Sequence, residues 1–110
     1  MQKNISIIIP VYNEELSINS LYNEIKSIVK DNFNLHEIIF VDDGSNDSSF
    51  NIIKKLVLDD LCVIAIKLNR NYGKSEALNE GFKSAQYDYV ATLDGDLQDD
   101  PNEIINLLNT

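Results

Sequence analysis

Four short apolar runs recur along the chain, and a polar segment follows each of them. They occupy residues 5–11, 37–42, 62–68 and 89–94 and are rich in Ile and Val. Their apolar positions are mostly continuous and do not alternate with polar ones. Continuous apolar runs of this length are typical of strands buried on both faces, so the pattern predicts a parallel sheet.

Apolar residues between these runs recur every three or four positions, which is the spacing of an amphipathic helix. Asn13 is placed to cap the first predicted helix, and Pro101 lies near the start of the fourth, where a proline loses no helical hydrogen bond. The apolar positions are Leu16, Leu21, Ile25, Ile28 and Val29 in the first helix, Phe50, Ile53, Leu56 and Val57 in the second, several within 75–86 in the third, and Ile104, Ile105, Leu107 and Leu108 in the fourth.

Regular alternation of strand and helix predicts an α/β fold with an open, mainly parallel, Rossmann-like sheet flanked by helices. The 110 residues suit a single domain, and neither a linker nor an internal repeat divides them. The chain ends inside the fourth predicted helix, so we expect residues 1–110 to be part of a truncated domain.

Composition narrows the function classes. The hydrophobic content of 44% is that of a globular protein, and the net charge of −9 argues against a sequence-independent grip on nucleic acid. A phosphate ligand is still compatible with this charge, because a bound divalent cation reverses the local sign. Cys62, the single cysteine, lies in an apolar run, which predicts a buried, inert thiol and fits a reducing, cytoplasmic setting. No apolar stretch approaches the roughly 18 residues that span a bilayer.

Polar and acidic residues gather where the predicted strands end. The four segments are 10–15, 41–49, 68–77 and 93–100. In an open parallel sheet all carboxyl ends lie at one edge, where such sheets bind their ligands. The sequence therefore predicts that four distant segments converge in one crevice.

Each segment also has an interpretation without a ligand. Asp42, Asp43 and Gly44 could form an ordinary turn, followed by Ser45 or Asn46 as the cap of the second helix. The acids of the fourth segment could form a solvated loop that faces a helix N-terminus, and we prefer this interpretation for residues 99–100.

Asp94 and Asp96 fit a metal better than a solvated loop. Asp94 ends an apolar run, and Gly95 allows a sharp turn between the two carboxylates, which can then point at one cation. Hard cations prefer oxygen ligands, and Gln98 offers a neutral oxygen nearby.

Arg70 and Lys74 are the only cations in the four segments. They could balance the surrounding acids, or they could bind a pyrophosphate. Gly73, just before a predicted helix, could bring backbone N–H groups to an anion. Tyr12 lies in the crevice and could stack on a base, whereas His36 lies at the opposite edge and is interpreted as a surface residue.

Four stretches together carry a family resemblance, in order, over nearly the whole chain. They are "SIIIPVYNEE", "IIFVDDGSNDSS", "LNRNYGKSEALNEGF" and "YVATLDGDLQDDP". The chain resembles the N-terminal half of family-2 inverting glycosyltransferases with the GT-A fold, and most of all the branch that transfers a sugar to a polyprenyl phosphate. The resemblance implies a UDP- or GDP-sugar donor, a Mn²⁺ or Mg²⁺ cofactor, and a polyprenyl phosphate or saccharide acceptor.

The resemblance also implies roles for individual positions. It places Asp42 as the acceptor of a ring N–H of the base, and Asp43 in a mainly structural role. The positions matching nucleotide contacts are Pro10, Tyr12, Asn13, Glu14, Val41, Asp42, Arg70, Lys74, Asp94 and Gly95.

The fourth stretch matches the DXD motif of this family. Asp94 and Asp96 are implied as the catalytic acids, and Asp96 and Gln98 as the metal ligands. Asp100 stands where the polyprenyl-phosphate branch has a proline, which is a departure on the surface side of this loop.

The half of such an enzyme that binds the acceptor is expected to lie beyond these residues, together with any membrane attachment. We therefore expect a cytoplasmic protein, in full length on the cytoplasmic face of a membrane, and an isolated chain with little transferase activity. Two other classes stay open: a non-catalytic nucleotide-binding or self-associating (homo-oligomeric) module, and a phosphorelay receiver domain. The strand that precedes "VDD" argues against a receiver, which carries its acid pair after the first strand.

Overall fold

Strands and helices alternate along the part of the chain that this computed structural model describes, residues 3–94. The elements are β1 (Lys3–Val11), α1 (Ile18–Asn32), β2 (Phe33–Asp42), α2 (Ser49–Asp59), β3 (Val63–Lys67), α3 (Lys74–Ser84) and β4 (Tyr89–Thr92). All of the predicted strands and the first three predicted helices are present. The fourth predicted helix lies outside the described residues.

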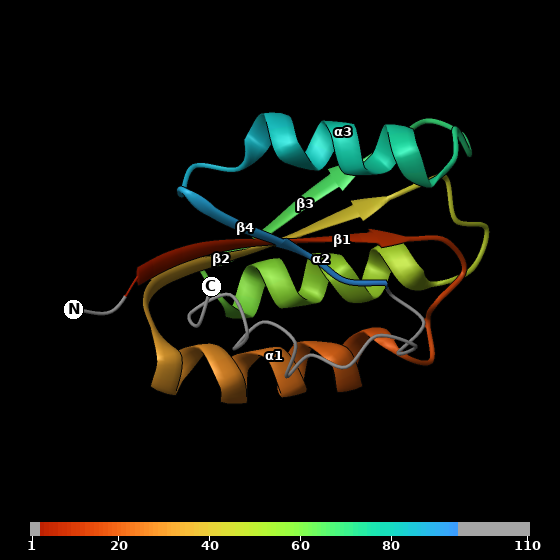
Figure 1. The fold of residues 1–110 in the computed structure, drawn as a ribbon. Coiled ribbons are helices and arrows are strands. Elements are labelled where there is room, and N and C mark those ends of the chain that lie inside the picture. The colour runs from red at the N-terminus through yellow and green to blue at the C-terminus, as the bar shows by residue number, and fades with distance from the viewer. Residues whose placement is uncertain (1–2, 95–110) are drawn as a thin grey trace.

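The strands form one parallel sheet in the order β3-β2-β1-β4. α1 and α2 cover one face of this sheet and α3 covers the other, so the molecule has three layers (Figure 1). The predicted α/β class with an open parallel sheet is therefore confirmed.

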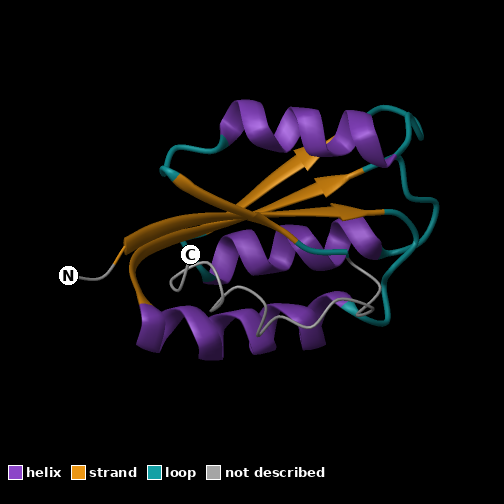
Figure 2. Cartoon of the chain, in the orientation of Figure 1, coloured by secondary structure: helices purple, strands orange, loops and turns teal. Residues whose placement is uncertain are grey.

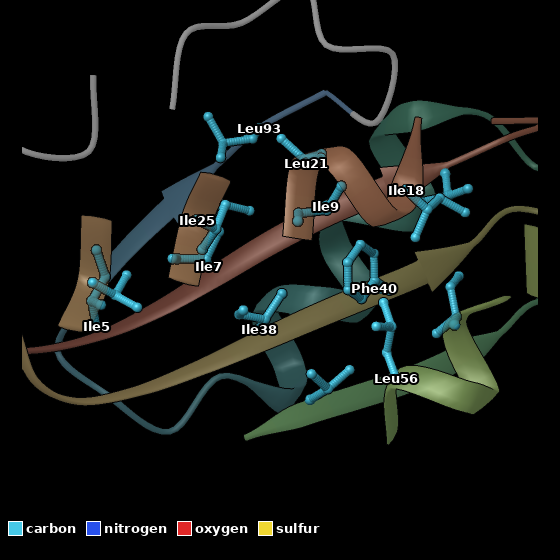
Figure 3. Packing of buried hydrophobic residues seen from close by; sticks show 14 of the residues in the cluster. Ile5, Ile7, Ile9, Ile18, Leu21, Ile25, Ile38, Phe40, Leu56 and Leu93 are labelled. Carbon is cyan, nitrogen blue, oxygen red and sulfur yellow. The ribbon is translucent and has the colours of Figure 1, made fainter. Parts of the chain in front are cut away.

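The larger core lies between the sheet and the helices α1 and α2. It includes Ile7 and Ile9 from β1, Phe40 from β2 and Ile25 from α1, all completely buried (Figure 3). Each of these side chains stabilises the fold by about 1.5–3 kcal/mol through removal from water. This core holds the central strands in place, and with them the segments that follow at their carboxyl ends.

A smaller core lies under α3. Ile8, Ile39 and Val41 point to this face and pack with Ala77 of α3. Burial on both faces, predicted from the continuous apolar runs, holds for the central strands β1 and β2. It holds only in part for β3 and β4, because among the described residues each has a neighbour on one side alone.

The largest differences from the predicted element boundaries are at the starts of β2, α1 and α2. β2 begins at Phe33, so His36 lies within the strand, because the polar residues that open it still pair with β1. α1 begins only at Ile18, after Ser17, and Leu16 is left 96% exposed. α2 begins at Ser49, with Ser48 at the cap position in place of Ser45 or Asn46.

Cys62 is only half-buried, so the prediction of a buried thiol was wrong, but partial burial together with the carboxylate of Asp60 raises its pKa. A raised pKa lowers the thiolate fraction, which agrees with the unreactive thiol predicted from the sequence. Within residues 3–94, no helix combines the length and apolar character required to cross a membrane.

Candidate functional site

The segments that follow the strands meet at one edge of the sheet. The loops after β1, β2 and β3 gather at the same side of the molecule (Figure 2). The backbone joins neighbouring strand ends directly, since Asp43 N–H donates to Val11 O at 2.8 Å and Leu93 N–H donates to Ile8 O at 3.1 Å. The convergence predicted from the sequence is thus present in the structure.

Asn13 links the loop after β1 to the loop after β2. Its backbone N–H donates to Ser45 Oγ at 2.9 Å, and its side-chain Oδ1 accepts from the Asn46 N–H at 2.8 Å. Its φ of 53° lies in the left-handed region, which Asn tolerates better than most residues. The prediction that Asn13 caps the first helix was wrong, because its side chain faces a loop 33 residues further on.

The next residues extend this link. Glu14 N–H donates to Ser49 Oγ at 2.9 Å, and Ser48 N–H donates to Glu15 Oε2 at 3.0 Å. Asp47 accepts from the N–H groups of Ser49 and Glu15. Partial burial acts to raise the pKa of Asp47, but the hydrogen bonds from Ser49 and from Glu15 hold it below its usual value. Hydrogen bonds from both sides thus tie the two loops together.

Asp42 is completely buried at the end of β2. Its Oδ1 accepts from the Ser45 N–H at 3.3 Å, whereas its Oδ2 has no hydrogen-bond partner within residues 3–94. A buried acceptor without a partner costs about 1–3 kcal/mol, and more when it is charged. Such a group is an exception in native proteins and marks a place where a ligand donor can bind.

Asp43 holds the loop after β3. It is 4% exposed, and its two carboxylate oxygens accept from the N–H groups of Tyr72 at 2.8 Å and Gly73 at 3.0 Å. The structural role implied for Asp43 agrees with these contacts. They also correct the expectation for Gly73, because its N–H binds the carboxylate of the chain itself and is not directed at an external anion.

The two cations of the site belong to this same loop. The guanidinium carbon of Arg70 lies 4.7 Å from the centre of the Tyr72 ring, in a cation–π arrangement. Lys74, the first residue of α3, forms an ion pair with Asp94 after β4. This ion pair joins the third loop to the fourth, so contacts run without a break through all four strand ends.

The structure brings together most of the predicted nucleotide positions. Tyr12 is 42% exposed at this edge, whereas Pro10 is partly buried in β1. Val41 is completely buried in the smaller core, which leaves its backbone as the part that can meet a ligand. Gly95, Asp96 and Gln98 lie outside the described residues.

The predicted metal site depends on residues that the structure does not describe. Within residues 3–94, no group of three or more His, Cys, Asp or Glu side chains is arranged to hold a metal ion. Asp94 is the predicted acid of the fourth loop that is described, and it faces Lys74. The donor set proposed for the metal is therefore Asp96 and Gln98, whose oxygen atoms are of the type that Mn²⁺ and Mg²⁺ prefer.

Comparison with sequence families decides the assignment. The model of glycosyl transferase family 2 matches residues 6–110. The chain belongs to this family.

A curated relative of this family 2 chain is the undecaprenyl-phosphate 4-deoxy-4-formamido-L-arabinose transferase of Proteus mirabilis (strain HI4320). It is 45% identical over 107 residues, which are 96% of this chain and 33% of the relative. The chain thus spans about a third of the length of the curated relatives that it matches.

Two solved structures share the fold of the family 2 chain. Staphylococcus aureus TarS 1–349 in complex with UDP-GlcNAc is 28% identical, with a TM-score of 0.76 over 96% of this chain and 30% of that one. Glucosyl-3-phosphoglycerate synthase from Mycobacterium tuberculosis, in complex with Mn²⁺, UDP and glucosyl-3-phosphoglycerate, is 25% identical, with a TM-score of 0.73 over 97% of this chain and 39% of that one. The described sheet and helices are the nucleotide-binding half of the GT-A fold.

The sequence did not reveal the side chains that tie the loops together. Ser45, Asp47 and Ser49 accept backbone N–H groups from the loop after β1. A signal was present, since clusters of Ser, Asn and Asp favour bonds from side chain to backbone in loops. The partners could not be read from the sequence, because they lie more than 30 residues away.

Proposed function

We propose that the chain is the donor-binding part of a family 2 glycosyltransferase that moves a sugar from a nucleoside diphosphate to a polyprenyl phosphate, with inversion. The 45% identity to a transferase named for undecaprenyl phosphate supports this acceptor class. UDP is favoured as the nucleotide, because the two structural relatives described above were solved with UDP-GlcNAc and with UDP. Residues 1–110 are then the nucleotide-sugar-binding part of a longer domain.

The unpartnered Oδ2 of Asp42 is the observation that carries this proposal. It is buried at the ligand-binding edge of a parallel sheet, where it can accept one hydrogen bond. The ring N–H of uracil or guanine is a donor of matching polarity. Binding a base would remove the cost of the orphaned acceptor, and a ligand without that N–H would leave it in place.

Tyr12 and Asn13 complete the nucleoside side of the proposed site. Tyr12 is exposed next to the linked loops and offers an aromatic face for the base. Asn13 uses its backbone and side chain to join the first two loops, so its role is to fix the shape of the pocket. Glu14 is fixed in the same way through Ser49.

Arg70 and Lys74 serve the diphosphate in this proposal. Departure of the sugar leaves negative charge on the diphosphate, and cations placed beforehand stabilise that charge as it develops. Lys74 balances Asp94 in the structure, so a diphosphate would compete with Asp94 for the same ammonium group. A divalent cation bound by Asp96 and Gln98 would supply Lewis-acid stabilisation of the same charge.

A phosphate acceptor suits this set of residues. It is already anionic near neutral pH and therefore needs no strong general base to attack the sugar carbon. Attack from the face opposite the leaving diphosphate, in a single displacement, inverts the configuration at that carbon.

Titration calorimetry tests the proposal directly. The chain is titrated with UDP, GDP and UDP-GlcNAc, with and without Mn²⁺, as wild type and as Asp96→Ala. We expect UDP to bind more tightly in the presence of Mn²⁺, and Asp96→Ala to remove most of the metal-dependent gain. Binding that is indifferent to both the metal and the substitution would contradict the assigned metal site. Absence of binding to any of the three nucleotides would contradict the proposed function.

A further inference from the structure

The carboxylate of Asp43 lies directly beneath the loop that carries both cations of the site. Its oxygens accept two consecutive N–H groups, from Tyr72 and Gly73, and it is 4% exposed. Hydrogen bonds from backbone N–H groups to a buried carboxylate are charge-assisted and stronger than neutral ones. The contact fixes the segment that lies between the two cations. Arg70 is two positions before Tyr72, and Lys74 directly follows Gly73.

The next residue presses against the same loop. Gly44 has a φ of +76°, and a Cβ at this position would come within 2.4 Å of Arg70 C and 2.5 Å of Asn71 N. Both contacts are to backbone, which cannot move aside as a flexible side chain would. The backbone of the turn after β2 therefore packs directly against the backbone of the loop after β3, with no room for a side chain at Gly44.

Further contacts within the loop after β3 fix the side chains of Arg70 and Tyr72. Tyr72, whose N–H is bound to Asp43, presents its ring to the guanidinium of Arg70 at 4.7 Å. The Tyr72 hydroxyl donates to Asn69 Oδ1 at 2.7 Å, which closes the loop on itself. Gly73 is at the cap position of α3, so its bond to Asp43 also fixes where Lys74 begins the helix.

We infer that Asp43 is a positioning residue that sets the affinity for the diphosphate without touching the nucleotide. This inference rests on the proposed function and assigns a task that the family assignment does not. The carboxylate of Asp43 binds two N–H groups of the loop, so the Gly73 amide is not available to a phosphate. The groups of this loop that can bind a phosphate are then the side chains of Arg70 and Lys74. Asp43 acts on the diphosphate only through these cations.

A purely structural role would affect the whole site. In that case, loss of the carboxylate would weaken binding of the nucleoside and of the nucleotide by the same factor. A positioning role for the cations affects only the part of the affinity that the diphosphate adds. The ratio of the UDP and uridine dissociation constants separates the two.

The experiment measures the dissociation constants of UDP and uridine, or of GDP and guanosine if that pair binds better. It uses wild type, Asp43→Asn, Arg70→Gln and the double variant. Asp43→Asn keeps the shape of the side chain but places an amide NH₂ group opposite one of the two loop N–H groups. Two donors then face each other, and that hydrogen bond is lost. We expect it to weaken UDP binding by about five- to tenfold, in line with one lost charge-assisted hydrogen bond, with uridine binding unchanged within about twofold. In the Arg70→Gln background its effect on UDP should shrink to about twofold, because one of the two cations it positions is gone and only Lys74 remains.

Amide hydrogen exchange on the same samples reports the loop contact without any ligand. The Tyr72 and Gly73 amides should exchange at least tenfold faster in Asp43→Asn than in wild type. Equal losses for UDP and uridine, full additivity with Arg70→Gln, or unchanged exchange at both amides would each overturn the inference and leave the proposed function standing. A wild-type chain that binds no nucleotide would overturn both.

Discussion

Asp42 shows how a single buried atom can connect stability and function. Its Oδ2 is enclosed by the fold and has no partner among the described residues, while its Oδ1 has a weak one at 3.3 Å. Proteins retain such an unfavourable group where a ligand uses it, and binding sites often lower stability for this reason. Changing Asp42 should therefore separate stability from binding.

We expect Asp42→Asn to weaken nucleoside binding at least tenfold, because the amide cannot reproduce the charged acceptor. The free energy of unfolding should stay unchanged or rise by up to about 1 kcal/mol, since a buried unpaired carboxylate is removed. Calorimetric titration with uridine and urea denaturation measure the two quantities. Asp88→Asn, an exposed residue in the turn before β4, is the control. Equal losses of binding and stability would contradict the assignment of Asp42.

Gly44 and Gly73 offer a matched pair of glycines with positive φ. Gly44→Ala introduces a Cβ that meets backbone at 2.4 Å, whereas nothing lies within 4 Å of a Cβ at Gly73. Gly73, at φ 105° and ψ 160°, lies in a region that essentially only Gly occupies, so we expect Gly73→Ala to lower the free energy of unfolding by about 1–3 kcal/mol through backbone strain alone. Gly44→Ala should lower it further, because the clash with the backbone of the other loop adds to the strain. Urea denaturation midpoints give the comparison. Equal effects would mean that the close approach of the two loops is absent in solution.

Residue types in the loops could be predicted, but their partners could not. The sequence showed that Asp42, Arg70, Lys74 and Asp94 share one edge, because strand ends converge in any parallel sheet. It did not show that Asn13 adopts a left-handed conformation and binds the second loop instead of capping a helix. Local sequence is compatible with both uses of Asn, and the choice depends on a segment that only tertiary folding brings near.

At the scale of elements, a cluster of titratable groups joins α1, β2 and the turn after α2. Asp60 accepts from the Tyr22 hydroxyl at 2.6 Å and from the Cys62 N–H at 2.9 Å, and it pairs with Lys26 at 2.9 Å. Lys26 also lies 2.8 Å from His36 Nε2. Burial, followed by the nearby Lys26 ammonium, lowers the pKa of His36, so His36 serves this cluster as a neutral acceptor.

The stability of the fold should change with pH through this cluster. Burial acts to raise the pKa of Asp60, but hydrogen bonds from Tyr22 and Cys62 and the charge of Lys26 lower it to about 2. Folded Asp60 thus binds fewer protons than unfolded Asp60 between about pH 4 and pH 2, and stability is lost as the pH falls through that window. Burial and the bond to Asp60 raise the pKa of Tyr22 to about 12, so stability is also lost as the pH rises from about 10 to 12.

The Asp60→Asn variant isolates the acid part of this effect. We expect it to be less stable than wild type at neutral pH and to approach wild type as the pH falls below 4. The difference between the two free energies of unfolding, measured by urea denaturation at fixed pH values, is the quantity to follow. Asp88→Asn should show a difference near zero throughout. A constant deficit for Asp60→Asn from pH 7 to pH 3 would contradict the depressed pKa.

Glu37 is an element-scale feature that the hydrophobic pattern concealed. It opens an apolar run but is only 2% exposed, and its carboxylate accepts from Ser6 Oγ at 2.6 Å and from the Gln86 N–H at 2.8 Å. These bonds fasten the turn between α3 and β4 to the two central strands. A polar residue at the edge of an apolar run reads as a strand end, so its burial could not be predicted without the position of that turn.

At the scale of the whole molecule, the described part has the architecture of the nucleotide-binding half of the GT-A fold. The sheet brings the proposed donor-binding residues together at its carboxyl edge, and β4 ends at Thr92, two residues before Asp94 and shortly before the predicted metal ligands in the sequence. The curated relatives are about three times as long as this chain. Donor binding and transfer should therefore separate when these 110 residues are studied alone.

We expect the 110-residue chain to bind UDP but to transfer sugar to undecaprenyl phosphate at less than about 1% of the rate of a full-length relative. The physical reason is that a reaction between two bound substrates needs both held in one geometry, and loss of the acceptor site removes that advantage even when the donor is well placed. The measurement follows the transfer of radiolabel from a UDP-sugar to the lipid fraction. The Asp96→Ala variant gives the background signal. Adding the remaining part of the relative as a separate polypeptide should restore some transfer if the two halves associate. Turnover by the chain alone at a rate near that of the longer enzyme would show that the acceptor site lies within residues 1–110.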